Sequence, residues 1–247
     1  MLKHGKHNLN IRVAVAACNR PEYTRRSLSA IFGMVGFENN SIINISIDRL
    51  IDGSINDKVV EVARFFGVEP FIADKKLYCN GNIFNALSDA WSNEEAEFVI
   101  MVEDDIIVSP DAFKYMKWAA ENFIDDHNIK SVGLWNHRDG WSPSEPIANN
   151  ATKIMLQEYF SVWGWGTWRD RWEQIRSEWT TGDDSPATSW DVVICNSMKG
   201  KKELVPAISR SYNCGEKLGT HRGRAWPKSL INSYLDPDGD IEYWLER

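Results

Sequence analysis

The chain has 247 residues and a formal net charge of −7. This length suits one α/β domain with a large core, and the acidic balance excludes duplex nucleic acid as the main partner, because binding to a phosphate backbone needs a basic surface. The four cysteines are widely spaced without a Cys-x-x-Cys pair, which excludes a zinc knuckle and a small disulfide scaffold.

The start of the chain, residues 1–10, is polar and lacks an apolar run. No later segment approaches the roughly 20 apolar residues that cross a bilayer. We therefore expect no integral membrane segment and a cytoplasmic location with reduced thiols.

The first half alternates short apolar runs with helical segments. Strands are predicted at residues 11–17, 42–47, 68–73 and 98–102, and helices at 23–32, 56–66, 83–91 and 111–122. Gly81 is expected in a polar loop before the third helix. Four strand–helix alternations within about 120 residues predict an α/β fold with a mostly parallel central sheet flanked by helices.

The second half is less regular. Strands are predicted at residues 131–135 and 154–159, and helices at 167–176 and 191–198. Between them, residues 136–150 are polar. No internal repeat and no clean linker divides the chain.

Several polar side chains directly follow predicted strands. Asn19 and Arg20 follow the first strand, Asp48 follows the second, and the triplet Glu103-Asp104-Asp105 follows the fourth. Ligands of doubly wound sheets bind beyond the carboxyl ends of the strands. We therefore expect these residues to meet in one crevice.

The acidic triplet is the strongest local signal. Three adjacent carboxylates at the end of a buried strand repel one another and lose hydration, so they need a cation or several donors to stay ionised. Mg²⁺ or Mn²⁺ bridging a diphosphate fits this need. The alternative is a solvated acidic turn that caps the following helix.

The triplet and the residues after it also resemble a known family. Glu103-Asp104-Asp105, followed by Ser-Pro-Asp-Ala-Phe at 109–113, is similar to the Glu-Asp-Asp region of the N-acetylglucosaminyltransferase I family, which has the GT-A fold of nucleotide-diphospho-sugar transferases. The resemblance implies that Asp105 binds the metal ion and that Asp104 contacts the ribose of the donor.

Two other segments of the first half resemble the same family. Residues 13–21 are similar to its first strand and nucleotide loop, which implies nucleotide-sugar contacts for Ala17, Asn19 and Arg20. Asp48 matches an acid that contacts the nucleotide base. The family has Cys-Asp-Arg where this chain has Cys18-Asn19-Arg20, so the expected uracil base stays open.

Tryptophan is unusually abundant, with 12 residues. Residues 160–168 resemble the Trp-Gly-Trp-Ala-Thr-Trp stretch of many bacterial glycosyltransferase-like proteins. The resemblance places Trp163, Gly164, Trp165 and Gly166 at the donor sugar, with glycines that allow close approach and indoles that wall off the sugar. The alternative for each tryptophan is simple packing in a large core.

Two further positions match family motifs in the same order. Asp191, after Ser-Trp, resembles the Trp-Asp step that carries the general base of the inverting enzymes; the alternative is an ordinary helix N-cap. His221 lies in a loop that resembles the C-terminal loop of GT-A enzymes, which implies a further metal ligand or a phosphate contact; the alternative is a structural or surface residue. Arg222 and Arg224 match either diphosphate contacts or an exposed basic loop.

Together the motifs predict a glycosyltransferase that depends on Mn²⁺ or Mg²⁺ and acts in polysaccharide biosynthesis. It would move a sugar from a nucleotide-diphosphate sugar, expected to be a UDP-sugar, to a saccharide acceptor with inversion. One domain, 1–247, would contain a nucleotide-sugar-binding half (about 1–130) and an acceptor-binding and catalytic half (about 131–247). The alternatives are a non-catalytic carbohydrate-binding protein and a sugar nucleotidyltransferase; the latter would need a glycine-rich loop after the first strand, and residues 18–21 contain no glycine.

Overall fold

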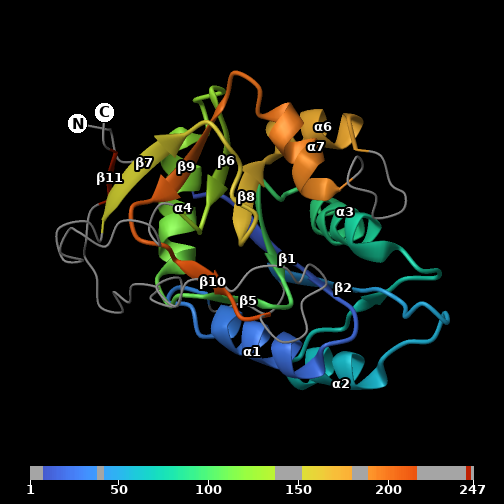
Figure 1. Cartoon of the computed structure of the whole chain (residues 1–247). Coiled ribbons are helices and arrows are strands. Elements are labelled where there is room, and N and C mark those ends of the chain that lie inside the picture. The colour runs from blue at the N-terminus through green and yellow to red at the C-terminus, as the bar shows by residue number, and fades with distance from the viewer. Residues whose placement is uncertain (1–7, 38–41, 137–151, 180–188, 216–242, 246–247) are drawn as a thin grey trace.

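The computed structural model describes residues 8–37, 42–136, 152–179, 189–215 and 243–245. Within these residues, one sheet of nine strands runs through the molecule (Figure 1). In order across the sheet, the strands are β11 (Trp244–Leu245), β7 (Lys153–Gln157), β9 (Lys202–Pro206), β6 (Ile129–Gly133), β8 (Trp165–Trp168), β4 (Phe98–Glu103), β1 (Ile11–Ala17), β2 (Ile43–Ile47) and β3 (Phe71–Ile72).

Most neighbouring strands are parallel. Strand β1 pairs in parallel with β4 on one side and with β2 on the other, and β2 continues in parallel to β3. Strand β8 is antiparallel to both β4 and β6, while β6 and β9 are again parallel. The α/β fold with a mostly parallel sheet, predicted from the alternation of strands and helices, is therefore confirmed.

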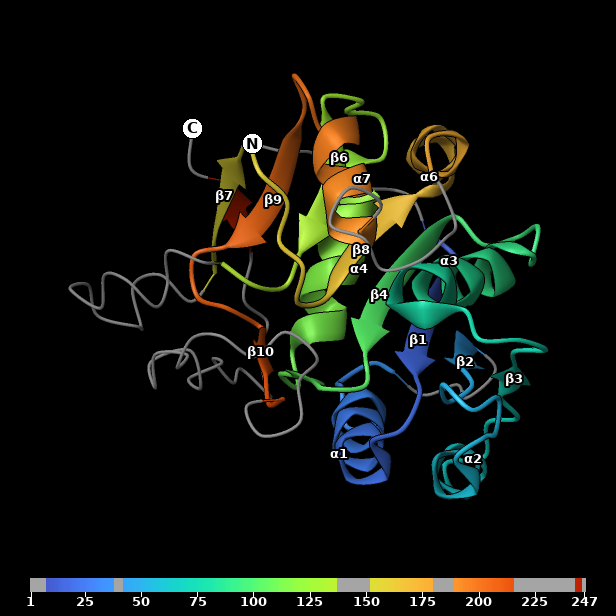
Figure 2. The same cartoon turned by 45° about the vertical axis from the view of Figure 1, so that its right-hand side comes forward.

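Helices cover both faces of the sheet (Figures 1 and 2). One face packs against α1 (Pro21–Phe32), α2 (Asp57–Phe65) and α4 (Ala112–Phe123), and the other against α3 (Tyr78–Trp91), α6 (Arg169–Ser177) and α7 (Trp190–Ser197). Side chains of a strand point alternately to the two faces, so Val13 and Val15 join the first core and Ala14 and Ala16 the second. Both faces of the central strands are buried, as expected for parallel strands.

A two-stranded antiparallel sheet lies beyond β4. It consists of β5 (Ile106–Val108) and β10 (Ser211–Asn213). A buried ion pair anchors it, because Arg210 Nε donates to Asp111 Oδ2 at 2.7 Å while both side chains are 1% exposed. Asp111, which we expected in the first turn of a helix, thus lies just before α4 and serves as the partner of Arg210.

Three expected elements differ from the structure. Residues 167 and 168, where we expected the start of a helix, belong to strand β8 (Trp165–Trp168), and helix α6 begins only at Arg169. Gly81, expected in a loop, lies within α3, which begins at Tyr78. The third strand is reduced to Phe71–Ile72, because only these two residues pair with β2.

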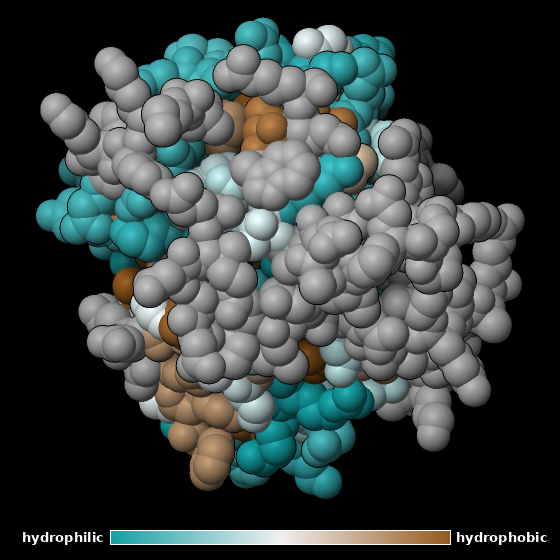
Figure 3. Space-filling view, turned by 90° about the vertical axis from the view of Figure 1, so that its left-hand side faces the viewer, coloured by the Kyte–Doolittle hydropathy of each residue, from teal (hydrophilic) through white to brown (hydrophobic). Residues whose placement is uncertain are grey.

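On the face shown in Figure 3, the visible described residues form separate hydrophilic and hydrophobic areas. Among the described residues, no helix is long and apolar enough to cross a membrane.

Candidate active site

The carboxyl ends of β1, β2 and β4 lie side by side, because β1 sits between the other two strands. The last sheet hydrogen bonds hold the acids in place: Asp48 N donates to Ala17 O at 3.0 Å, and Asp104 N donates to Ala16 O at 3.1 Å. The strand ends that carry Asp48 and Asp104 are therefore both neighbours of the end of β1, as predicted from the order of the elements.

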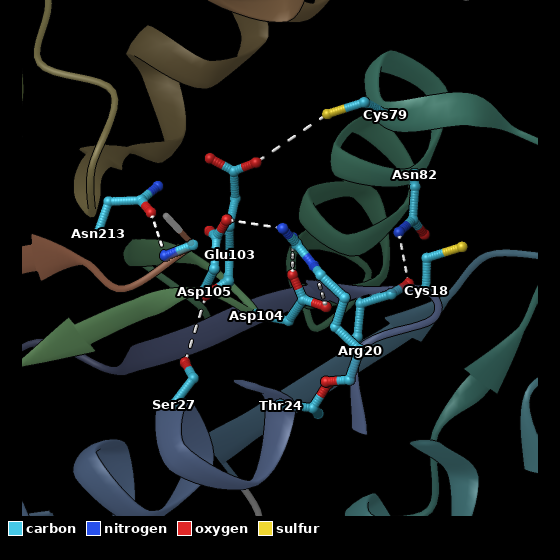
Figure 4. A network of polar contacts seen from close by, with 12 residues as sticks. Cys18, Arg20, Thr24, Ser27, Cys79, Asn82, Glu103, Asp104, Asp105 and Asn213 are labelled. Atoms are coloured by element: carbon cyan, nitrogen blue, oxygen red, sulfur yellow. Dashed lines mark hydrogen bonds and ion pairs between the residues drawn. The ribbon is translucent and has the colours of Figure 1, made fainter. Parts of the chain in front are cut away.

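Arg20 lies beside the acidic side chains and contacts Asp104 and Asp105 (Figure 4). Its guanidinium contacts both oxygens of Asp104, with Nε 3.3 Å from Oδ2, and its Nη1 donates to Asp105 Oδ2 at 2.8 Å. The backbone carbonyl of Arg20 accepts from Thr24 Oγ1 at 2.9 Å in the first turn of α1. The cation that the acidic triplet needs is thus supplied in part by the chain itself.

Burial controls the ionisation of this cluster. Burial lowers the pKa of the Arg20 guanidinium, but the charges of Asp104 and Asp105 outweigh it and raise the pKa above its ordinary value. Burial raises the pKa of Asp104 to about 6, although Arg20 acts in the opposite direction. The Arg20 guanidinium therefore does not fully compensate the buried Asp104 carboxylate for its loss of hydration.

Glu103 belongs to the same cluster, although we assigned it no role from the sequence. Burial raises its pKa well above the ordinary range, and the charges of nearby carboxylates raise it further. These carboxylates are those of Asp105, Asp104 and Asp191. Cys79 Sγ lies 4.0 Å from Glu103 Oε2. The sequence could have indicated a role for Glu103, because it is the last residue of β4 and lies next to two predicted site residues.

Asp191 lies in the first turn of α7. Its carboxylate accepts hydrogen bonds from Ser189 Oγ and, at 2.9 Å, from Val192 N. Its charge adds to the raised pKa of Glu103. The N-cap of α7 is Ser189, so Asp191 is not the N-cap considered from the sequence but a residue of the first turn, and its role as the general base stays a prediction.

The end of β10 covers Asp105. Cys214 N donates to Asp105 O at 2.8 Å, and Gly215 N donates to Asn213 Oδ1 at 2.6 Å. A Cβ atom at Gly215 would lie 2.5 Å from Asp105 Oδ2, so only glycine fits here. The segment that we likened to the C-terminal loop of GT-A enzymes thus begins against the acid predicted to bind metal.

Asp48 forms the other end of the site. Its Oδ1 accepts from Leu77 N at 2.7 Å and from Arg49 N at 2.8 Å, and its Oδ2 lies 2.5 Å from Lys76 Nζ. Lys76 Nζ is also 3.8 Å from Cys18 Sγ, next to Asn19. Asn19 itself is exposed. Sequence reasoning missed Lys76, because it lies in a loop without a recognisable motif.

The glycines and indoles of residues 163–166 lie in or beside the central sheet. A Cβ at Gly166 would lie 2.4 Å from Phe98 Cε1, and one at Gly164, whose φ is +84°, would lie 2.9 Å from Leu134 Cδ1. Trp165 is 1% exposed and Trp163 6% exposed. The close approaches seen at both glycines are to core side chains.

His221, Arg222 and Arg224 lie outside the residues that the structure describes. Their expected roles at the metal ion and the diphosphate stay predictions.

The acidic cluster has the chemistry of a site for a hard divalent cation. In the described ranges, no three His, Cys, Asp or Glu side chains form a group that could hold a metal ion by themselves. Mg²⁺ and Mn²⁺ in phosphate-binding sites commonly use one or two carboxylates and take their other ligands from phosphate and water. Asp105 fits as such a protein ligand, beside the positive charge of Arg20.

Comparisons with known proteins match the chain to one family. The model of the GNT-I family matches residues 83–237, more than half of the chain. The chain is 22% identical over 238 residues to an alpha-1,3-mannosyl-glycoprotein 2-beta-N-acetylglucosaminyltransferase of Arabidopsis thaliana, a match that covers 91% of this chain and 50% of that protein. The chain thus spans about half the length of this curated relative.

A solved structure is similar in fold. The mannosyltransferase PcManGT from Pyrobaculum calidifontis, in complex with GDP-Man and Mn²⁺, matches with a TM-score of 0.54 and 12% identity, over 83% of this chain and 59% of that one. The similarity confirms the predicted GT-A type of fold.

Proposed function

Because the chain belongs to the GNT-I family, as its motifs indicated, we propose that it is a glycosyltransferase that moves a sugar from a nucleotide-diphosphate sugar to a saccharide hydroxyl. The observation that carries this proposal is the cluster of Arg20, Asp104 and Asp105 at the carboxyl ends of β1 and β4. The naming of the curated relative as an N-acetylglucosaminyltransferase supports the reaction. The GDP-Man and Mn²⁺ held by the structural neighbour support the donor class and a divalent cation.

The nucleotide part of the donor is assigned to the ends of β1 and β2. We propose that Asp48 contacts the base, uracil in the simplest case, and that Ala17, Asn19 and Arg20 border the nucleotide. Asp104, buried beside Arg20, is assigned to the ribose. The indoles and glycines of residues 163–166 are assigned to the wall behind the donor sugar. Because Trp163 and Trp165 are buried, they would support this wall from within the core.

The diphosphate part is assigned to Asp105 and Arg20. Asp105, together with His221, would hold Mn²⁺ or Mg²⁺. When bound, the cation stabilises the negative charge that develops on the departing diphosphate. Arg20 Nη1 lies 2.8 Å from Asp105 Oδ2, so the same guanidinium is placed to donate to a diphosphate oxygen.

The acceptor side is assigned to Asp191. A carboxylate that accepts the proton of the acceptor hydroxyl allows attack from the face opposite the leaving group, which inverts the anomeric configuration. Residues 1–130 would then form mainly the donor half and residues 131–247 the acceptor half. The cytoplasmic location and the role in polysaccharide biosynthesis stay predictions.

Calorimetric titration with UDP, GDP, CDP and ADP, each with and without Mn²⁺, tests the proposal. We expect the unmodified protein to bind one nucleotide in a Mn²⁺-dependent manner and Asp105→Ala to lose at least tenfold in that affinity. Glu94→Ala, which removes an exposed acid away from the site, is the matched control and should bind normally. Absence of nucleotide binding under all conditions would leave a carbohydrate-binding protein as the better interpretation.

A turnover assay separates a transferase from a binding protein. Slow hydrolysis of the bound nucleotide sugar without an acceptor supports a transferase, and its complete absence despite tight donor binding argues against turnover.

A further inference from the structure

Lys76 forms a contact that neither the motifs nor the comparisons assign. Its ammonium lies 2.5 Å from Asp48 Oδ2, and its side chain is 23% exposed while that of Asp48 is 2% exposed. Lys76 is therefore the accessible member of this pair, and a ligand that approaches Asp48 meets Lys76 first.

The loop that carries Lys76 is held in an unusual conformation. Tyr78 has a φ of +60°, which is the left-handed region that bulky residues rarely adopt. On one side of Tyr78, Leu77 N donates to Asp48. On its other side, Cys79 Sγ lies 4.0 Å from Glu103. Strained backbone persists where the surroundings enforce it, and it occurs preferentially at functional sites. The strained segment here connects both ends of the candidate site.

The ammonium has several partners but keeps its charge. Lys76 Nζ is 3.8 Å from Cys18 Sγ and 5.4 Å from the centroid of the Tyr78 ring. Burial lowers its pKa, but the hydrogen bond and the charge of Asp48 outweigh this and raise the pKa. A protonated Lys76 presents donors only, and Asp48 presents acceptors only.

We propose that Lys76 is a specificity-determining residue that, together with Asp48, reads a ring N–H and an adjacent carbonyl of the nucleotide base. The inference rests on the proposed function. Uracil offers this edge at N3–H with its flanking carbonyls, and guanine offers it at N1–H and O6. With the carboxylate opposite the ring nitrogen and Lys76 on the side of uracil O4 or guanine O6, cytosine and adenine would present a lone pair to Asp48 and an amine to Lys76. Both contacts are then repulsive, so UDP or GDP is accepted and CDP and ADP are rejected.

The loop does not need the ion pair between Lys76 and Asp48 to stay attached to Asp48. Asp48 Oδ1 already accepts from Leu77 N and Arg49 N, so the loop is attached without the ammonium. Lys76 neutralises Asp48 in the absence of a ligand and turns to the carbonyl of the base when the N–H takes its place on the carboxylate.

The test measures the affinity for UDP, GDP, CDP and ADP in Mn²⁺ by calorimetry, and the affinity for pyrophosphate by competition. We expect Lys76→Met to weaken binding of the preferred nucleotide by about tenfold or more, as for loss of a charged hydrogen bond, while affinity for pyrophosphate stays within about twofold. Its preference over CDP should fall. Lys75→Met, the exposed neighbouring lysine, is the matched control and should change neither quantity.

Two further variants keep the outcome clear. Lys76→Arg retains the donors and should restore most of the preference, and melting temperatures identify any variant with a disturbed fold. Equal affinities and an equal base order for Lys76→Met and the unmodified protein would overturn the inference and leave the transferase proposal intact. A preference for CDP or ADP in the unmodified protein would also overturn it. Failure of the unmodified protein to bind any nucleotide would remove both.

Discussion

Glu203 is a buried acid that the proposed reaction does not use. Its side chain is 0% exposed, and its oxygens lie within hydrogen-bond distance of Ser131 Oγ (3.0 Å), Gln157 Nε2 (2.7 Å) and Ser161 N (2.9 Å). Burial raises its pKa to about 8, although these hydrogen bonds act in the opposite direction. At neutral pH Glu203 is therefore largely protonated, with Oε1 able to donate to Ser131.

Because Glu203 is protonated in the folded state, we expect the free energy of unfolding to fall as the pH rises. In the unfolded chain the carboxyl ionises near pH 4.3, so between about pH 5 and 8 the folded state binds the additional proton. Stability linked to Glu203 is thus present at low pH and is lost up to about pH 8. Glu203→Gln should remove a slope of about 1 kcal/mol per pH unit in urea unfolding, whereas the exposed Glu158→Gln should not. Parallel pH profiles of Glu203→Gln and the unmodified protein would contradict the assignment.

A substitution at Asp191 can distinguish a catalytic role from a role in the first turn of α7. Asparagine keeps most of the hydrogen bonding at a helix N-terminus but cannot accept the acceptor proton. Asp191→Asn should therefore retain nucleotide affinity and melting temperature and lose about 10²-fold or more in transfer rate. Transfer at the rate of the unmodified protein would show that Asp191 serves only the first turn of α7.

Site residues that follow strands could be predicted, and those in loops could not. Asp48 and Asp104 had to lie at the same edge of the sheet, because neighbouring parallel strands end at one edge. The contact of Lys76 depends on the φ of Tyr78, which follows from tertiary packing and has no local sequence signature.

Among the strands, β8 is one that the sequence could not predict. Its four residues, Trp165–Trp168, have two buried indoles and a buried threonine, with no alternation that indicates a strand. It exists because β4 and β6, distant in sequence, each present an edge to it. The strands that alternate with helices were predictable because each carries its own apolar run.

The position of Gly166 in β8 gives a test at this scale. A methyl group there would lie 2.4 Å from the ring of Phe98 and 3.1 Å from Val99 O. Gly166→Ala should lower the free energy of unfolding by about 3 kcal/mol, because the buried sheet has no room to relax. Combining it with Phe98→Leu should cost less than the sum of the two single changes, as measured by urea unfolding. Strict additivity would show that the alanine is accommodated elsewhere.

The whole molecule is organised around one sheet that crosses the boundary expected near residue 130. The fold class could be predicted, since alternating elements form a parallel sheet in only a few ways. The strand order could not. The insertion of β8 between β4 and β6, and the pairing of β10 with β5, bring late segments of the chain to the acids of the first half.

The strand order also determines how the chain assembles during synthesis. Strand β1 emerges early and pairs first with β2, but its other partner, β4, starts only at Phe98, and β4 in turn awaits β8. Pairing across such long sequence separations is slow, because each closure orders a long loop before contacts form. A nascent chain that ends before residue 98 therefore exposes one apolar edge of β1 to other chains. Recombinant production should accordingly benefit from slow synthesis at low temperature. Fewer incomplete chains are then present at one time, so their exposed β1 edges are less able to pair with one another.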